Sequence, residues 1–190
     1  MAKLYIISPP KIDLGNFLPK LDECLQKHKP KYFQLRLKDI SDEQILFAAR
    51  STIPICRKYK VPFLLNDSAK LALECGADGV HIGDEDDGVA EARELLGKKA
   101  IIGASCYNSL ELAQKAVDEG ANYVSFGAFY PTKTKVAKSR AELETLQKWK
   151  VMSKVPCSAI GGITFENAKP IKAAGADYIC MISAIWDELL

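Results

Sequence analysis

The chain has 190 residues, with 26 Lys and Arg against 24 Asp and Glu, and two His. Its 48% of hydrophobic and 26% of charged residues are typical of a soluble globular domain and exclude disordered and fibrous classes. A net charge of +2 offers nucleic acid and anionic membranes no strong field, and two histidines exclude a metal site or mechanism that needs three. The apolar run at 4–7 is short and is followed by Ser8-Pro9-Pro10, so we expect neither a signal peptide nor a membrane span.

Cysteine occurs six times, an even number that would permit three disulfides. The chain is not small, however, and it contains no Cys-x-x-Cys spacing and no recognisable export signal. Most of the cysteines lie in apolar or helical patterns, where the side chain acts as a small hydrophobe. We therefore predict reduced thiols in a cytoplasmic protein. The six are Cys24, Cys56, Cys75, Cys106, Cys157 and Cys180.

Short β-type runs alternate with helix-like segments along the whole chain. The β-type runs are predicted at 3–8, 32–37, 62–66, 79–83, 100–105, 123–128, 156–162 and 178–183. Capping-box pairs predict three helix starts, at Ser41 with Gln44, Asn108 with Glu111, and Ser139 with Glu142. A phrase of Gly followed by Ala recurs at 76–77, 120–121 and 175–176, and it predicts a left-handed glycine that closes a helix before a buried strand.

Eight such units predict either a closed (β/α)₈ barrel or a doubly wound sheet. The doubly wound fold expects a Gly-rich fingerprint after the first strand, but Ser8-Pro9-Pro10 stands there and no G-x-G-x-x-G occurs elsewhere. We therefore predict one α/β domain over residues 1–190, a (β/α)₈ TIM barrel. Its C-terminal helix should be shortened, because seven residues follow Ser183.

Active sites of such barrels lie at the C-terminal ends of the strands, so polar residues at those ends are candidates. Gln34, Arg36 and Lys38 alternate with two leucines, which predicts that the polar side chains point into the barrel mouth and the leucines toward the helices. A guanidinium and an ammonium group there would suit phosphate oxygens. The alternative is a strand whose polar face reaches solvent at the rim.

Candidate cation ligands follow the third and fourth predicted strands. Asn66 and Asp67 precede a helix-like segment, so either could simply be its N-cap. The acidic run at 84–87 could be a solvated loop, or one of its carboxylates could share Mg²⁺ with the Asn66-Asp67 pair. His81 lies between two apolar residues, a pattern more typical of a hydrogen-bonded core histidine than of a catalytic base.

The remaining strand ends predict anion contacts. Ser105 is a hydrogen-bond donor or a turn residue, and the loop at 129–135 holds two hydroxyls and two ammonium groups that could grip an anion or form a plain basic loop. Gly161-Gly162 and Ser183 lie at the ends of the last two predicted strands, and barrels usually bind phosphate in the loops that follow these strands. Together these groups suit an enzyme that binds one phosphorylated substrate and one Mg²⁺-bound, more highly phosphorylated substrate.

In their order along nearly the whole chain, these motifs resemble those of the thiamine phosphate synthase family. The resemblance implies a Mg²⁺-dependent transferase that joins hydroxymethylpyrimidine diphosphate to thiazole phosphate and releases pyrophosphate. The matching segments are Gln34-Leu35-Arg36-Leu37-Lys38, Asn66-Asp67, 76–83 with Asp86, Pro131-Thr132-Lys133-Thr134-Lys135, and 159–164 with Asn167.

The resemblance also implies roles for individual residues. The pyrimidine diphosphate would be held by Gln34, Arg36, Lys38, Asn66, Ser105 and Lys135, with Leu35 and Leu37 in the same segment. Mg²⁺ would be ligated by Asp67 and Asp86. Thiazole phosphate would be held by Thr132, Thr134, Gly162, Ile182 and Ser183, with Lys133 in the same loop. The catalytic groups would be Arg36, Lys38, Ser105 and Lys135, of which Arg36, Lys38 and Lys135 together with Mg²⁺ stabilise the departing pyrophosphate.

Three rival interpretations remain: a related thiazole tautomerase, another phosphosugar-binding epimerase or aldolase, and a non-catalytic thiazole-phosphate-binding regulator. The inward strand positions offer no deep lysine for an aldolase. The chain departs from the family pattern at Asp84, where Gln is common, at Cys106-Tyr107, where Ala-His is common, and in its short C-terminus. Its expected partners are small phosphorylated molecules rather than nucleic acid or membrane, and the sequence is compatible with a homo-oligomer.

Overall fold

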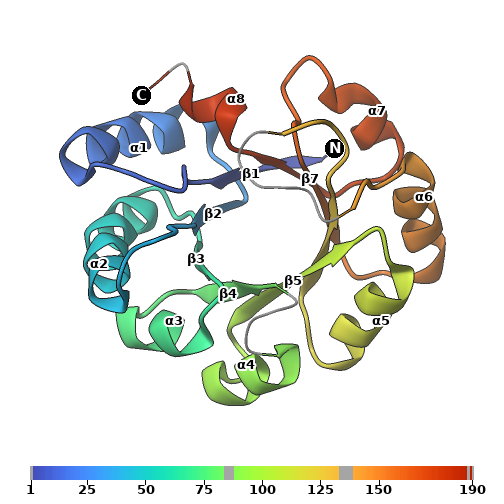
Figure 1. The fold of residues 1–190 in the computed structure, drawn as a ribbon, viewed down its shortest axis with the longest axis horizontal. Helices are drawn as coiled ribbons and strands as arrows, with labels where there is room; N and C mark the ends of the chain where they lie inside the picture. Colours follow the sequence, from blue (N-terminus) through green and yellow to red (C-terminus); the bar gives the residue numbers. More distant parts are fainter. Residues whose placement is uncertain (1, 84–87, 133–138, 188, 190) are drawn as a thin grey trace.

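Eight parallel strands close into a barrel, and the helices form a ring around it (Figure 1). The computed structural model describes residues 2–83, 88–132, 139–187 and 189. The strands are β1 (Lys3–Ile7), β2 (Tyr32–Leu35), β3 (Phe63–Asn66), β4 (Gly79–Ile82), β5 (Ile101–Tyr107), β6 (Tyr123–Gly127), β7 (Cys157–Ile160) and β8 (Tyr178–Met181). Each strand pairs with the next, and β8 closes the barrel on β1.

The predicted (β/α)₈ barrel is confirmed, with one helix after each strand. The helices are α1 (Leu14–His28), α2 (Asp42–Lys58), α3 (Ala69–Cys75), α4 (Val89–Leu96), α5 (Leu110–Asp118), α6 (Leu143–Met152), α7 (Ala168–Ala173) and α8 (Ser183–Trp186). None of the described helices is long and apolar enough to cross a membrane. Strands β2, β4 and β6 are buried at every position, as expected for parallel strands covered by helices on one side and by barrel contents on the other.

The eighth helix has one turn, as the short C-terminus predicts. Trp186 fixes this turn: its indole Nε1 donates a hydrogen bond to the Ile7 carbonyl at 2.7 Å, and its ring lies 5.0 Å from that of Phe17. Helix α8 therefore lies beside α1 (Figure 1), where its buried residues Ile185 and Trp186 belong to the core between strands and helices.

One of the three predicted capping boxes is confirmed, and two are wrong. Ser41 and Gln44 cap α2 reciprocally. Helix α5 is capped by Ser109, while the Asn108 side chain accepts a hydrogen bond from the backbone N–H of Glu142. Helix α6 begins after Glu142 without a side-chain cap, and the Ser139 hydroxyl donates to the Gly127 carbonyl. Contacts with distant segments thus take the two side chains that local sequence assigns to capping.

The recurring glycines behave as predicted. Gly76, Gly120 and Gly175 have φ values of 72°, 103° and 105°, in the region that residues with a Cβ atom rarely adopt. Each ends the turn between a helix and the next strand. The predicted reduced cysteines are confirmed too, because all six are free. Burial raises the pKa of Cys56 and Cys106 to about 12, so these thiols remain protonated and unreactive at neutral pH.

The apolar interior has two parts. The larger lies between the strands and the helices, and the smaller lies inside the barrel. Four tyrosines share the inner space, with ring centroids 5.3–6.0 Å apart in mostly edge-to-face contacts, an arrangement that aromatic quadrupoles favour. They are Tyr5, Tyr32, Tyr123 and Tyr178.

Gly103 provides the space for the Tyr123 ring. A Cβ atom at position 103 would lie 2.0 Å from the Tyr123 Cζ atom, and the ring cannot withdraw because Tyr123 is only 1% exposed. We therefore predict that Gly103→Ala lowers the free energy of unfolding by about 1–3 kcal/mol through overpacking. Urea denaturation monitored by circular dichroism measures this loss.

Gly15→Ala is the matched control, because the nearest atom to a new Cβ there is the Asp13 carboxylate oxygen at 3.3 Å, on a flexible side chain. Its unfolding free energy should stay the same or rise by up to about 1 kcal/mol, because alanine is the better helix former and Gly15 lies in α1. Equal denaturation midpoints for Gly103→Ala and the unmodified protein would contradict the proposed packing constraint.

Candidate active site

The alternation predicted for the second strand is confirmed. Gln34 is only 2% exposed and points into the barrel, where its Oε1 accepts from the Tyr5 hydroxyl at 2.9 Å and its Nε2 donates to Asn66 Oδ1 at 2.7 Å. Leu35 and Leu37 belong to the core between strands and helices. Their side chains therefore face away from the mouth, and any contact with a bound substrate must use their backbone groups.

Arg36 and Lys38 continue this pattern beyond the end of β2. The backbone N–H of Arg36 donates to Ser8 Oγ at 2.9 Å, and that of Lys38 donates to the Pro10 carbonyl at 3.0 Å, so the loop after β1 supports the segment. The Lys38 ammonium forms an ion pair with Asp67 at the end of β3. Burial lowers the pKa of Arg36, while the nearby negative charge of Asp67 acts in the opposite direction. Two cations and one carboxylate thus meet at the mouth.

Neither Asn66 nor Asp67 caps α3, so the capping interpretation of this pair is wrong. Ser68 is the N-cap, and its hydroxyl accepts from the backbone N–H of Leu71 at 3.2 Å. Asp67 has a φ of 70°, a conformation that Asp tolerates better than most residues, and its backbone N–H donates to the His81 carbonyl at 2.8 Å. This turn leaves the Asn66 amide directed at Gln34 and the Asp67 carboxylate at Lys38.

His81 is a buried, hydrogen-bonded core histidine, as its apolar neighbours predict. Its Nδ1 lies 2.9 Å from the Tyr123 hydroxyl, and its Nε2 lies 3.0 Å from Ser105 Oγ. The expectation that β5 ends at Ser105 is wrong, because the strand continues to Tyr107 with a shift of register between Ser105 and Tyr107. Ser105 is therefore a strand residue rather than a turn residue, held against the histidine of the neighbouring strand.

The loops after β6 and β7 pack tightly on each other. Gly161 and Gly162 have φ values of 103° and 60°, and a Cβ atom at Gly162 would lie 2.3 Å from the Pro131 carbonyl oxygen. The Tyr130 N–H donates to the Gly161 carbonyl at 3.0 Å, and the Asn167 side chain donates to the Gly162 carbonyl at 2.9 Å. The glycine pair is therefore required by the close approach of two loops, a reason that sequence patterns did not reveal.

The other predicted site residues divide into two groups. Thr132 is half-buried in the loop after β6, Ile182 follows β8, and Ser183 is the first residue of α8. The second group lies outside the described residues: the predicted ligand Asp86, its neighbour Asp84, and the predicted anion-binding residues Lys133, Thr134 and Lys135.

Sequence reasoning missed Tyr5 and Tyr123, whose hydroxyls contact Gln34 and His81. For Tyr123 the signal available was a tyrosine within a β-type run that pairs with Gly103 of the neighbouring run.

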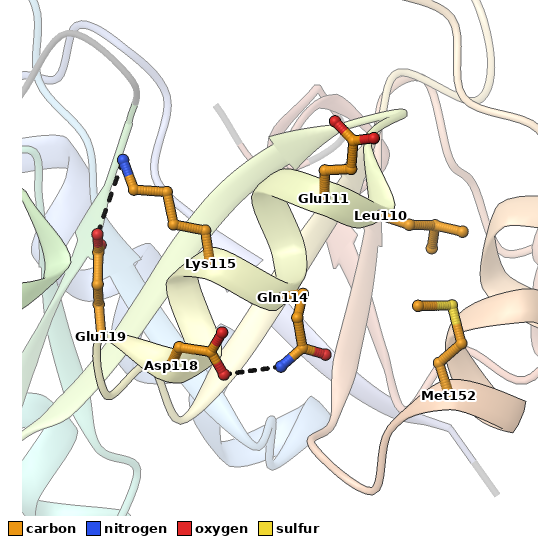
Figure 2. Close-up of a pocket in the computed structure, with 7 residues that line it drawn as sticks. All are labelled: Leu110, Glu111, Gln114, Lys115, Asp118, Glu119 and Met152. Atoms are coloured by element: carbon orange, nitrogen blue, oxygen red, sulfur yellow. Dashed lines mark hydrogen bonds and ion pairs between the residues drawn. The ribbon is translucent and has the colours of Figure 1, made fainter.

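A separate cavity of about 630 Å³ lies on the outer ring of helices, on α5 and the end of α6 (Figure 2). None of the predicted site residues lines it. Its lining residues are Leu110, Glu111, Gln114, Lys115, Asp118, Glu119 and Met152. Two polar pairs lie in its wall, as Figure 2 shows: Lys115 forms an ion pair with Glu119, and the Gln114 amide donates a hydrogen bond to Asp118. The cavity therefore lies on the helices, apart from the mouth.

The fold and the mouth together define a class of protein. A (β/α)₈ barrel that gathers a guanidinium, an ammonium, two amides and a carboxylate at the C-terminal ends of β2 and β3 is typical of enzymes that bind phosphorylated substrates. A family profile described as thiamine monophosphate synthase matches residues 4–185. The chain belongs to this family.

Individual relatives agree with the family match. The chain is 46% identical over 187 residues to a thiamine-phosphate synthase of Rhodospirillum centenum, covering 98% of this chain and 90% of that protein. It is 44% identical over 194 residues to one of Hyphomonas neptunium, covering 98% and 87%. Among solved structures, a thiamine phosphate pyrophosphorylase from Pyrococcus furiosus superposes with a TM-score of 0.81 at 34% identity, covering 96% and 86%.

The unfolding free energies of two variants distinguish the capping role of Ser68 from the site role of Asp67. We predict that Ser68→Ala lowers the unfolding free energy by about 1 kcal/mol, because α3 loses its N-cap. Asp67→Asn should lower it by about 0.5 kcal/mol or less, because the Lys38 pair is partly exposed and Asn tolerates a positive φ. Urea denaturation of both variants checks this order, and a larger loss for Asp67→Asn would return the capping role to Asp67.

Proposed function

We propose that the protein is a thiamine phosphate synthase, which transfers the pyrimidinylmethyl group of hydroxymethylpyrimidine diphosphate to thiazole phosphate. The observation that carries the proposal is the cluster of Arg36, Lys38 and Asp67 beside the Gln34–Asn66 amide pair. The chain belongs to the synthase family over 4–185, and in this proposal the cluster grips the diphosphate with a carboxylate next to it.

The proposed reaction needs stabilisation of a leaving group rather than a proton transfer. The bond between the pyrimidine CH₂ carbon and the diphosphate oxygen breaks, and the electron pair leaves with pyrophosphate. The thiazole nitrogen then forms the new bond to that carbon. Negative charge therefore grows on the diphosphate oxygens, where the positive charges of Arg36 and Lys38 stabilise it best. Partial burial of Arg36 strengthens this effect, because it lowers the local dielectric.

The residues present fit a magnesium ion. Mg²⁺ is usually held by one or two carboxylates and by substrate phosphates, and Asp67 offers a carboxylate that is one-third exposed at the mouth. Among the described residues there is no group of three or more His, Cys, Asp and Glu side chains that could hold a metal ion. Asp67 would hold the ion, with Asp86 as the second proposed ligand. When bound, the ion neutralises charge on the diphosphate.

The second substrate would lie between the loops after β6, β7 and β8. The close packing of 128–131 on Gly161 and Gly162 gives this side of the mouth a defined backbone shape. We assign thiazole phosphate to it. The assigned contacts are Thr132, Thr134, Gly162, Ile182 and Ser183, with Lys133 in the same loop, and Lys135 is assigned to the diphosphate.

The same arrangement favours a synthase over its relatives in function. A thiazole tautomerase or a thiazole-phosphate-binding regulator needs only the site of the second substrate. The cluster of Arg36, Lys38 and Asp67 would then have no diphosphate to bind. The proposed partners are accordingly the two small phosphorylated substrates, and the proposed location is the cytoplasm.

A coupled assay tests the function directly. Purified protein incubated with both substrates and Mg²⁺ should release thiamine phosphate and pyrophosphate in equal amounts, measured by chromatography and by a pyrophosphate-linked reaction. Omission of either substrate should abolish both products. Binding of thiazole phosphate without any thiamine phosphate formed would reject the synthase in favour of the tautomerase or the regulator.

Asp67→Asn tests the metal assignment. Loss of one carboxylate ligand should raise the Mg²⁺ concentration for half-maximal rate by at least about tenfold. Asp22→Asn is the matched control, because Asp22 also forms an ion pair with a lysine, Lys58, but on the outer helices α1 and α2. An identical Mg²⁺ dependence in Asp67→Asn and Asp22→Asn would remove Asp67 from the metal site.

A further inference from the structure

A continuous chain of five hydrogen bonds crosses the inside of the barrel. It runs from Ser105 through His81, Tyr123, Tyr5 and Gln34 to Asn66, with donor–acceptor distances of 2.7–3.0 Å. These residues come from six different strands. The chain links the residues proposed to bind the pyrimidine substrate at its two ends through His81, Tyr123 and Tyr5, to which no role has yet been assigned.

The Gln34–Asn66 bond determines which group donates and which accepts in each of the other four bonds. Gln34 donates a hydrogen bond from Nε2 to Asn66, so its Oε1 accepts a hydrogen bond from the Tyr5 hydroxyl. A tyrosine has one hydroxyl proton, so Tyr5 must accept from Tyr123. Tyr123 has then used its own proton, and it must accept from His81 Nδ1.

The same counting fixes the other end. A neutral imidazole that carries its proton on Nδ1 has an acceptor at Nε2, so the Ser105 hydroxyl donates to His81. Its proton then points away from the mouth, and Ser105 offers a bound molecule lone pairs only. At the opposite end Asn66 has accepted at Oδ1 and offers the N–H groups of Nδ2. The two ends therefore differ in polarity.

The packing prevents the chain from rearranging. Tyr5 and Tyr123 are each 1% exposed, with ring centroids 5.8 Å apart, and Tyr123 fills the space at Gly103. Burial raises the pKa of both phenols well above the ordinary value, so both keep their protons at neutral pH. Each phenol therefore keeps one proton and a fixed oxygen position, so each hydroxyl donates one hydrogen bond of the chain and accepts the other.

We propose that Tyr5 and Tyr123 are positioning residues that hold His81 as the Nδ1–H tautomer and thereby make Ser105 a hydrogen-bond acceptor and Asn66 a donor at the mouth. The part that concerns substrate rests on the proposed function, with Ser105 and Asn66 in the pyrimidine-binding roles that the family resemblance implies. The tautomer itself is a property of the protein alone and is measured without any substrate.

The tautomer of His81 shows in which direction the hydrogen bonds run between Ser105 and Asn66. If the Gln34 amide had the opposite orientation, every bond would reverse, His81 would carry its proton on Nε2, and Ser105 would offer a proton to the ligand. The ¹⁵N chemical shifts of the imidazole nitrogens distinguish these two states. The protein contains two histidines. Spectra of ¹⁵N-His-labelled protein with and without the His28→Gln substitution therefore assign the signals of each.

At a pH where imidazole is neutral, the full-length protein should show His81 protonated at Nδ1 and unprotonated at Nε2. An Nε2–H tautomer in the unmodified protein would overturn the proposal. Tyr5→Phe is the sharpest variant, because Tyr5 is linked to His81 through Tyr123. Its loss releases the Tyr123 proton to donate to Nδ1, so the His81 signals should move toward the Nε2–H form. Unchanged His81 signals would sink the idea.

Tyr32→Phe is the matched control. Its ring stacks on Tyr123 at 5.6 Å within the same cluster, but its hydroxyl interacts with Tyr178 instead. The His81 signals and the kinetics of this variant should equal those of the unmodified protein. An equal shift in Tyr32→Phe and Tyr5→Phe would show a general packing effect and reject the positioning role.

Tyr123→Phe extends the test to substrate. It keeps the ring in its space and removes the hydroxyl, so the KM for the pyrimidine diphosphate should rise about tenfold, the loss expected for one misoriented hydrogen bond. The KM for thiazole phosphate should stay within about twofold by the same measure. Equal rises in both KM values would contradict selective positioning. Absence of synthase activity in the unmodified protein would reject the proposed function and leave the tautomer result standing.

Discussion

The closed parallel barrel imposes the constraint on which the rest of this structure depends: its interior must be filled, and four tyrosines fill it. The Tyr123 ring occupies the space that Gly103 leaves open, and its hydroxyl lies 2.8 Å from that of Tyr5. Aromatic side chains supply the packing volume, while their hydroxyls form a polar layer beneath the mouth. Packing and function are therefore coupled, because the residues that fill the barrel also contact Gln34 and His81.

Above that layer, the mouth is arranged by short segments rather than by the regular elements themselves. The hydrogen-bonded part of β2 ends at Leu35, yet Arg36 and Lys38 keep its alternation because the loop after β1 accepts their backbone N–H groups. Ser68 takes the cap of α3, which leaves Asn66 and Asp67 for the site. Arg36, Lys38, Asn66 and Asp67 thus depend on neighbours without chemical function, so substitutions outside the mouth are expected to alter activity.

Two structural features bear on the departures from the family pattern. At the C-terminal turn, the buried indole of Trp186 connects α8 to the end of β1. Cys106 and Tyr107 belong to β5 itself, beyond Ser105, where the register of the strand shifts against β6. That extension keeps Ser105 within the strand and beside His81. Nothing in the described residues explains the departure at Asp84.

The sequence by itself determined the eight βα units, the left-handed glycines of the αβ turns, and the inward and outward faces of the second strand. These features arise from local periodicity and backbone preference, which a single chain segment displays. Only the tertiary structure decided that Asn108 and Ser139 bond to distant backbone instead of capping helices, that Ser105 lies within a strand, and that Tyr5 meets Tyr123. Such contacts join residues up to 118 positions apart, and closure of the barrel brings them together.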